Sequence, residues 1–193
     1  MACSRDEVTT IAFAVPLILA AVLARAGHRV LLVDADLDQP SLHEVFRVDP
    51  APGAAQLLKG NQRFDLADLV QETRSGISVL PAGNDGAQTN RHSGHSATRF
   101  VDILRKSDYQ FVIIDSPPLL MRASAAQLAS AADDVLLTVR SGRSHEREVR
   151  RAKTLLDRQG AKLRGVVLND STLALHDYFA GLPLETEHGL DNR

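Results

Sequence analysis

The sequence has a single cysteine, Cys3, and no tryptophan among its 193 residues. One cysteine excludes an internal disulfide and is typical of a reducing compartment, so we expect a cytoplasmic protein. None of the seven histidines is spaced with that cysteine as zinc ligands are, so a zinc site is not expected either. His92 and His95 lie in a stretch rich in Gly, Asn and Ser over residues 83–96, which predicts a loop.

Strong net charge and a membrane-spanning apolar run are also missing. The formal net charge of −2 gives no general reason to expect nucleic acid as a partner. The apolar run over residues 11–24 is too short to cross a bilayer, and the preceding Arg5-Asp6-Glu7 lacks the positive charge of a secretory signal. We interpret this run as a buried strand followed by a buried helix.

Short apolar runs alternate with longer amphipathic stretches along the chain. The runs predict strands covered on both faces, over residues 8–14, 30–33, 77–80, 111–114, 135–139 and 165–168. The stretches between them predict helices over residues 17–26, 54–58, 66–72, 97–105, 124–131 and 144–159. This alternation predicts an α/β fold with a doubly wound, mostly parallel sheet and helices on both faces. We expect a single domain over residues 1–182 and a polar tail over 183–193.

Carboxylates stand where two of the expected strands end. Asp34 and Asp36 follow one strand, and Asp115 ends another just before two prolines that cannot continue it. Ligands of such folds bind at the carboxyl ends of the strands, so Asp34 and Asp36 are candidates for catalysis, and Asp34 and Asp115 for Mg²⁺. The structural alternative is that Asp34 only fills the crevice and Asp36 caps the next turn.

These segments resemble, in order, the cytoplasmic domain of bacterial tyrosine kinases of capsule and exopolysaccharide biosynthesis, within the MinD/ParA group of P-loop proteins. The resemblance extends from about Val8 to Asn169. Its motifs are a Walker A′ segment at 31–43, an "hLPAG" segment at 79–83, a Walker B segment at 109–118, and later strands at 139–142 and 165–169.

The resemblance implies a P-loop NTPase-like fold with Mg²⁺ and ATP as cofactors. It implies catalytic roles for Asp34 and Asp36, metal binding by Asp34 and Asp115, and a contact between Asn169 and the nucleotide base. It also implies a membrane-embedded polysaccharide chain-length regulator as the partner, which would bring the chain to the membrane, and it is compatible with a homo-oligomer.

The phosphate-binding loop of that family is missing from its expected place. The first glycine is Gly27 and the first lysine is Lys59, so the pattern G-x-x-x-x-G-K-[ST] is absent near the first strand, as though deleted. Asp38 also stands where the family usually has a basic residue. Without the N–H groups and lysine of such a loop, nucleotide binding is expected to be weakened or lost.

An arginine could supply the missing positive charge. Arg122, Arg140 and Arg143 lie at or after expected strand ends, and Arg140 is the candidate named here for the cofactor. The alternative for each of the three is a solvated surface position.

Several functions stay open. We favour a tyrosine-kinase-family protein that has weakened or lost nucleotide binding and a regulatory or scaffold role. A second is an active ATP-dependent enzyme with an unconventional phosphate site. A third is a MinD/ParA-type positioning protein that binds DNA, through the basic face of the helix at 144–159, or a membrane partner. That face is better interpreted as solvated, so nucleic acid is not expected. The fourth is a deletion product without a selected function.

Overall fold

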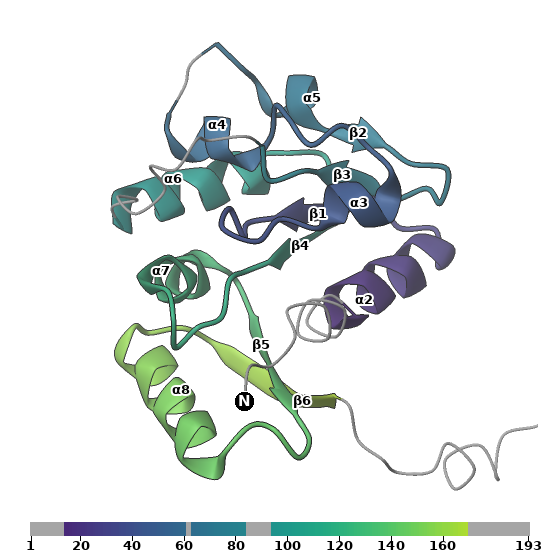
Figure 1. Ribbon diagram of the computed structural model, residues 1–193. Coiled ribbons are helices and arrows are strands. Elements are labelled where there is room, and N and C mark those ends of the chain that lie inside the picture. The colour runs from purple at the N-terminus through teal and green to yellow at the C-terminus, as the bar shows by residue number, and fades with distance from the viewer. Residues whose placement is uncertain (1–13, 61–62, 84–93, 170–193) are drawn as a thin grey trace, which may run out of the picture.

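The computed structural model describes residues 14–60, 63–83 and 94–169, which form an α/β fold (Figure 1). Its strands are β1 (Val30–Asp34), β2 (Gln71–Glu72), β3 (Ser78–Leu80), β4 (Phe111–Asp115), β5 (Val135–Arg140) and β6 (Leu163–Asn169). Its helices are α2 (Ala14–Arg25), α3 (Leu42–Phe46), α4 (Ala54–Leu58), α5 (Leu66–Leu69), α6 (Gly94–Arg105), α7 (Ala123–Ala131) and α8 (Glu146–Arg158). The predicted alternation of strands and helices is confirmed.

The described strands are divided between two sheets. A four-stranded sheet has the order β2-β3-β1-β4, in which β1 is parallel to β3 and β4, and the short β2 is antiparallel to β3. A two-stranded sheet contains β5 and β6 in parallel. The mostly parallel arrangement was predicted. The division was not, because an apolar run indicates a strand without indicating its neighbour.

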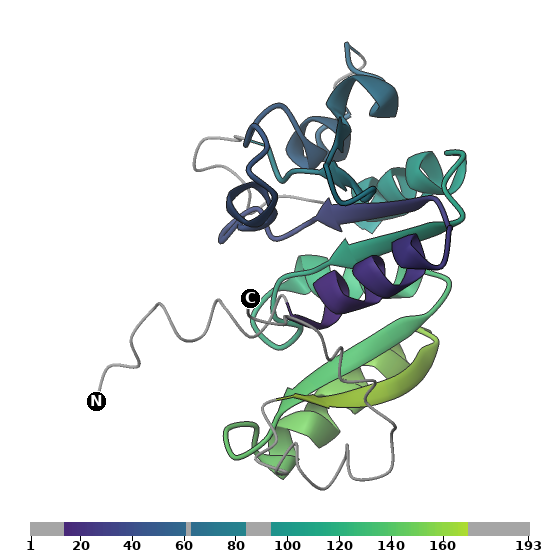
Figure 2. The same cartoon turned by 90° about the vertical axis from the view of Figure 1, so that its right-hand side faces the viewer.

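Helices cover both faces of the four-stranded sheet (Figure 2). Successive side chains of a strand point to opposite faces, so Leu31 and Val33 of β1 join a core with α4, α6 and α7, while Val30 and Leu32 join a core with α2 and α3. All four side chains are buried, as the uninterrupted apolar run predicts. The doubly wound character of the fold is therefore clearest here.

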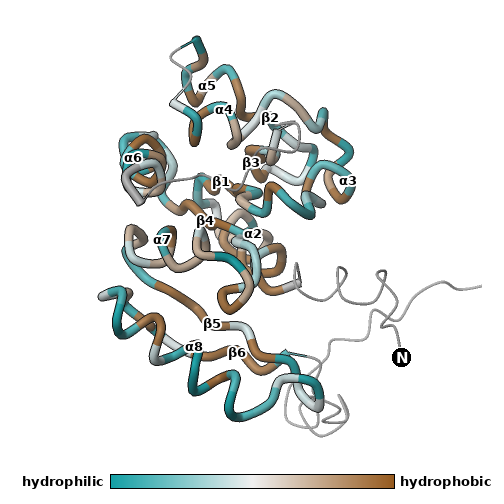
Figure 3. The backbone as a smooth tube through the Cα atoms, turned by 60° about the vertical axis from the view of Figure 1, so that its left-hand side comes forward, coloured by the Kyte–Doolittle hydropathy of each residue, from teal (hydrophilic) through white to brown (hydrophobic). Residues whose placement is uncertain are grey.

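Among the described elements, helices cover one face of the two-stranded sheet. Its side chains alternate between half-buried and exposed, and Leu136, Val166 and Leu168 are 47%, 55% and 57% exposed. Figure 3 shows both strands as largely hydrophobic segments beside α8. The prediction that β5 and β6 are covered on both faces is wrong, because apolar character along a strand does not reveal how many layers pack against it.

Three other predictions need comment. The helix expected over residues 66–72 ends at Leu69, because Gln71 and Glu72 pair with β3 instead. Of the first expected strand, residues 8–13 lie outside the described residues, and Ala14 begins α2. The expected loop at 83–96 is partly helical, since α6 begins at Gly94 and includes His95.

His92, the domain boundary after residue 182 and the polar tail all lie outside the described residues. Among the helices of the described ranges, none has the length and apolar character needed to cross a membrane.

Candidate functional site

Asp34, at the end of β1, is fully buried and accepts three backbone hydrogen bonds. Its Oδ2 accepts the N–H groups of Ser41 at 2.9 Å and Leu42 at 3.1 Å, and its Oδ1 accepts the N–H of Asp36 at 3.2 Å. This carboxylate therefore holds the turn that follows β1 against the start of α3. Both of its oxygens have protein donors, which supports the structural alternative raised from the sequence.

Asp36 lies inside that turn and is 9% exposed. Its Oδ1 accepts the N–H groups of Asp38 at 3.2 Å and Gln39 at 3.1 Å, so it caps the turn as the structural alternative predicts. No hydrogen bond to its Oδ2 is among those that the described residues make. Asp36 therefore combines a capping role with one oxygen that could face a ligand.

Asp115, at the end of β4, lies beside Asp34 in the register of the two parallel strands. It is 8% exposed, and its Oδ2 has no hydrogen-bond partner among the described residues. A buried carboxylate oxygen without a donor is costly unless a cation or a proton satisfies it. The structure thus brings Asp34, Asp36 and Asp115 together at one end of the sheet, as predicted.

Burial raises the pKa of all three carboxyl groups. For Asp34 and Asp36, hydrogen bonds from backbone N–H groups oppose the effect of burial. Asp115 has no such donors, and the charges of Asp34 and Asp36 add to burial, so its pKa rises to about 7. Asp115 is therefore the group in this cluster that would gain most from a bound cation.

Arg122 forms an ion pair with Asp38 at the edge of the cluster. The Nε of Arg122, just before α7, lies 2.9 Å from the Oδ2 of Asp38, and both side chains are partly exposed. The arginine charge also lowers the pKa of Asp36, against the effect of burial. Both residues stand out in the sequence, but their pairing does not. The one available signal was that β1 and β4 end side by side, which brings the turns after them together.

Arg140 and Asn169 lie at the ends of β5 and β6, in the two-stranded sheet. They are register partners, and the N–H of Ser141 donates to the carbonyl oxygen of Asn169 at 2.8 Å. The hydroxyl of Ser144 accepts the N–H of Arg140 at 3.0 Å. Figure 2 shows the arrowheads of β1, β4 and β6 on the same side of the molecule. The structure therefore places both residues at the expected end of the fold, but on a different sheet from the carboxylates.

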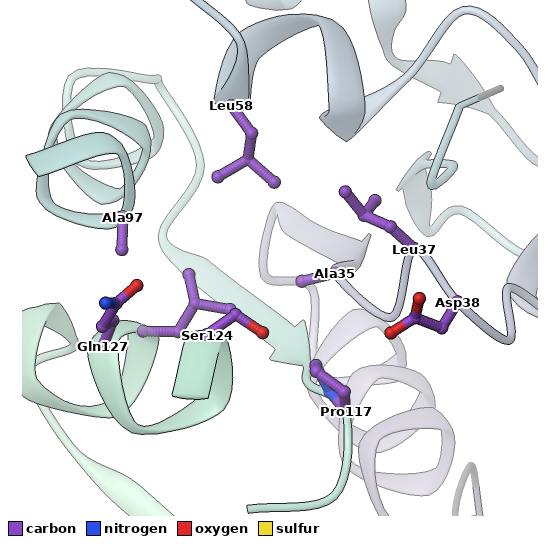
Figure 4. Close-up of a pocket in the computed structure, with 9 residues that line it drawn as sticks. Ala35, Leu37, Asp38, Leu58, Ala97, Pro117, Ser124 and Gln127 are labelled. Atoms are coloured by element: carbon purple, nitrogen blue, oxygen red, sulfur yellow. The ribbon is translucent and has the colours of Figure 1, made fainter. Parts of the chain in front are cut away.

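A small, open pocket adjoins the turn after β1 (Figure 4). Polar groups on its wall come from Asp38, Ser124 and Gln127, and the Oε1 of Gln127 has no hydrogen-bond partner in the described part of the chain. The remaining lining residues are apolar: Ala35, Leu37, Leu58, Ala97, Pro117 and Leu128. Sequence reasoning missed this pocket, since α4, α6 and α7 form it together with two turns.

Metal binding by this cluster would need a ligand in addition to the described side chains. Within residues 14–60, 63–83 and 94–169, no group of three or more His, Cys, Asp or Glu side chains could hold a metal ion. Mg²⁺ is commonly bound by one or two carboxylates together with the phosphates of a substrate. The unpartnered Oδ2 of Asp115 fits such a two-carboxylate site with Asp34.

Comparison with known proteins agrees with the architecture. A family model described as an AAA domain matches residues 9–146. The tyrosine-protein kinase CpsD of Streptococcus agalactiae is 30% identical over 165 residues, which cover 83% of this chain and 71% of CpsD. The kinase domain of the Escherichia coli tyrosine kinase ETK superposes with a TM-score of 0.73 and 28% identity, over 80% of this chain and 60% of that domain.

A nucleotide-bound neighbour has the same fold. The cobyrinic acid a,c-diamide synthase of Mycobacterium smegmatis, solved with an ATP analog and magnesium, superposes with a TM-score of 0.63 and 28% identity, over 77% of this chain and 65% of the synthase. Other tyrosine-protein kinases that match are much longer, and the chain spans only 20% and 21% of two of them. The order of the motifs, the fold and these relatives agree: the chain belongs to the family of bacterial tyrosine-protein kinases.

Proposed function

We propose that this chain is a tyrosine-kinase-family protein of capsular or exopolysaccharide biosynthesis that binds Mg²⁺-ATP weakly and has a regulatory or scaffold role. The observation that carries the proposal is the buried, unpartnered Oδ2 of Asp115 beside Asp34, at the end of two parallel strands. An oxygen in this state suits a cation, and this end of an α/β sheet is where nucleotides bind.

The carboxylates fit Mg²⁺ chemically. Mg²⁺ prefers oxygen ligands, and when bound it would neutralise the charge of the phosphate groups. Asp115 offers a free oxygen to it, whereas Asp34 is engaged by backbone donors and would contribute less. Asp36 has one oxygen engaged and one available to orient a reacting group.

Weak binding follows from the sequence around the site. The chain has no G-x-x-x-x-G-K-[ST] loop, so the usual cradle of backbone N–H groups and a lysine is missing. Each charge-assisted hydrogen bond lost contributes about 1.5–3 kcal/mol, so the loss of several lowers affinity by orders of magnitude. A regulatory or scaffold role requires less nucleotide affinity than efficient phosphotransfer.

The partner and the location are part of the same proposal. The resemblance to capsule and exopolysaccharide kinases supports a membrane-embedded chain-length regulator as the partner, with this chain on the cytoplasmic side. A homo-oligomer is compatible with it. This part of the proposal rests on that resemblance, and the carboxylate cluster does not bear on it.

Calorimetric titration with Mg²⁺-ATP and Mg²⁺-ADP tests the proposal. We expect weak binding by the unaltered chain and its loss in Asp115→Asn, which removes the free carboxylate. Asp133→Asn, which alters an exposed carboxylate paired with Arg105, is the matched control and should bind as the unaltered chain does. No heat up to millimolar nucleotide, from a protein with a folded circular dichroism spectrum, would overturn the nucleotide-binding part of the proposal.

A further inference from the structure

Arg122 is the cation that acts on the carboxylate cluster. The pKa values of Asp34, Asp36 and Asp115 respond to burial, to backbone donors and to charged side chains. Burial raises the pKa of Asp36, and the positive charge of Arg122 lowers it. Arg140, the residue expected from the sequence, lies on the other sheet.

The ion pair with Asp38 orients the guanidinium group and leaves part of it available. Asp38 lies near the Nε edge, at 2.9 Å. Among the ion pairs of the described residues, the pair with Asp38 is the one that involves Arg122, and the Arg122 side chain is 43% exposed. A guanidinium held in this way presents N–H groups in a fixed planar arrangement, which matches two oxygens of a phosphate group.

The surroundings of Arg122 are open to solvent. The Arg122 side chain is 43% exposed, and its partner Asp38 lines the open pocket together with Pro117 and Ser124 (Figure 4). Pro117 follows Asp115 by two positions, so the pocket, the ion pair and the end of β4 are neighbours. A phosphate group near Asp115 would thus lie close to a preoriented arginine.

We propose that Arg122, oriented by Asp38, donates hydrogen bonds to the phosphate oxygens of a nucleotide bound at the carboxylate cluster. It would replace part of the positive charge that the missing phosphate-binding loop supplies in the family. Asp38 is then a positioning residue, and its acidic character, where the family is usually basic, is explained by its partner. The inference rests on the proposed nucleotide binding and names a phosphate-binding residue for it.

Calorimetry on variants tests this role. Arg122→Ala should weaken Mg²⁺-ATP and Mg²⁺-ADP binding by about tenfold or more, because a charge-assisted contact is lost. Asp38→Asn should weaken both by a smaller factor, because the arginine remains but is no longer held. Binding of adenosine, which has no phosphate, should be unchanged in both variants. Arg164→Ala breaks an exposed ion pair with Asp134 on the two-stranded sheet and should alter nothing.

The outcomes separate this inference from the proposed function. If the unaltered chain binds no nucleotide, both are overturned. If it binds Mg²⁺-ATP, and Arg122→Ala binds within about twofold of it, only the phosphate-binding role of Arg122 is overturned. An equal loss of ATP and adenosine affinity in a folded Arg122→Ala protein would also overturn it, since the ion pair would then act through the shape of the site. Loss confined to the phosphate-bearing ligands supports it.

Discussion

The two sheets of this protein are built from similar sequences but differ in how they are buried. In the four-stranded sheet, every side chain of β1 is buried, because helices pack on both faces. In the two-stranded sheet, exposed side chains alternate with half-buried ones along most of each strand, and three of the exposed ones are large and aliphatic. The carboxylate cluster lies at the end of the doubly covered sheet. Because helices cover both faces there, the three carboxyl groups are buried, and burial raises their pKa values.

The largest difference between the two sheets is expected in the stability lost when an aliphatic side chain is shortened to alanine. Leu32→Ala in β1 should lower the free energy of unfolding by about 2–5 kcal/mol, because it opens a cavity in a fully buried core. Leu168→Ala in β6 should change it by no more than about 0.5 kcal/mol, because that side chain is 57% exposed. Urea unfolding of both variants measures the difference. Equal losses would show that the two sheets contribute alike to stability.

The raised pKa of Asp115, at the end of the four-stranded sheet, predicts that the free energy of unfolding depends on pH. Burial and the charges of Asp34 and Asp36 raise its pKa from the ordinary value of 3.8 to about 7, so between these pH values the folded state binds a proton that the unfolded state does not. Stability should therefore fall as the pH rises from about 4 to 7. Asp115→Asn removes this dependence, and above pH 7 it should be more stable than the unaltered chain by about 1–4 kcal/mol.

Urea unfolding at pH 5 and pH 8 checks the sign of this effect. The advantage of Asp115→Asn over the unaltered chain should be larger at pH 8. The difference in stability between the exposed control Asp133→Asn and the unaltered chain should be about the same at both pH values. An advantage of the same size at both pH values would contradict the linkage to this carboxyl group.

A smaller difference in stability is expected when glycine is replaced by alanine at two positions with ordinary backbone angles. A side chain at Gly53, just before α4, would overlap the Pro81 carbonyl oxygen and lie 2.6 Å from the N of Gly83. Gly53→Ala should therefore cost about 1–3 kcal/mol, through displacement of the backbone after β3. At Gly165 in β6, the nearest atom would be Leu136 Cδ2 at 3.8 Å, so Gly165→Ala should be tolerated. Thermal unfolding compares the two, and a clear loss for Gly165→Ala would show that the two-stranded sheet is packed more tightly than it appears.

The sequence was sufficient for most elements and for the carboxylates. The helix predicted at residues 54–58 has the observed bounds, and five of the predicted strands match observed ones within a few residues. These elements have an uninterrupted apolar or helical pattern, which is a local property. Gln71 and Glu72 were assigned to a helix because their strand conformation comes from pairing with β3 and not from their own propensity.

The sequence predicts the acidic residues of the candidate site but not the arginine that lies beside them. Asp34 and Asp115 are recognisable because each ends an apolar run, and parallel strands place such ends together. The Arg122–Asp38 ion pair has no local pattern, since its members lie in two turns far apart in the chain. The position of Arg140 at a strand end made it an equally good candidate until the strands were assigned to separate sheets.

The sequence by itself determined the order of strands and helices, the α/β class, the family and the presence of carboxylates at two strand ends. All of these depend on residue patterns within a short stretch of chain. Only the tertiary structure decided which strands share a sheet, which apolar faces are covered, and which charges meet. These depend on packing between distant segments, and the unpartnered oxygen of Asp115 and the ion pair of Arg122 become visible only there.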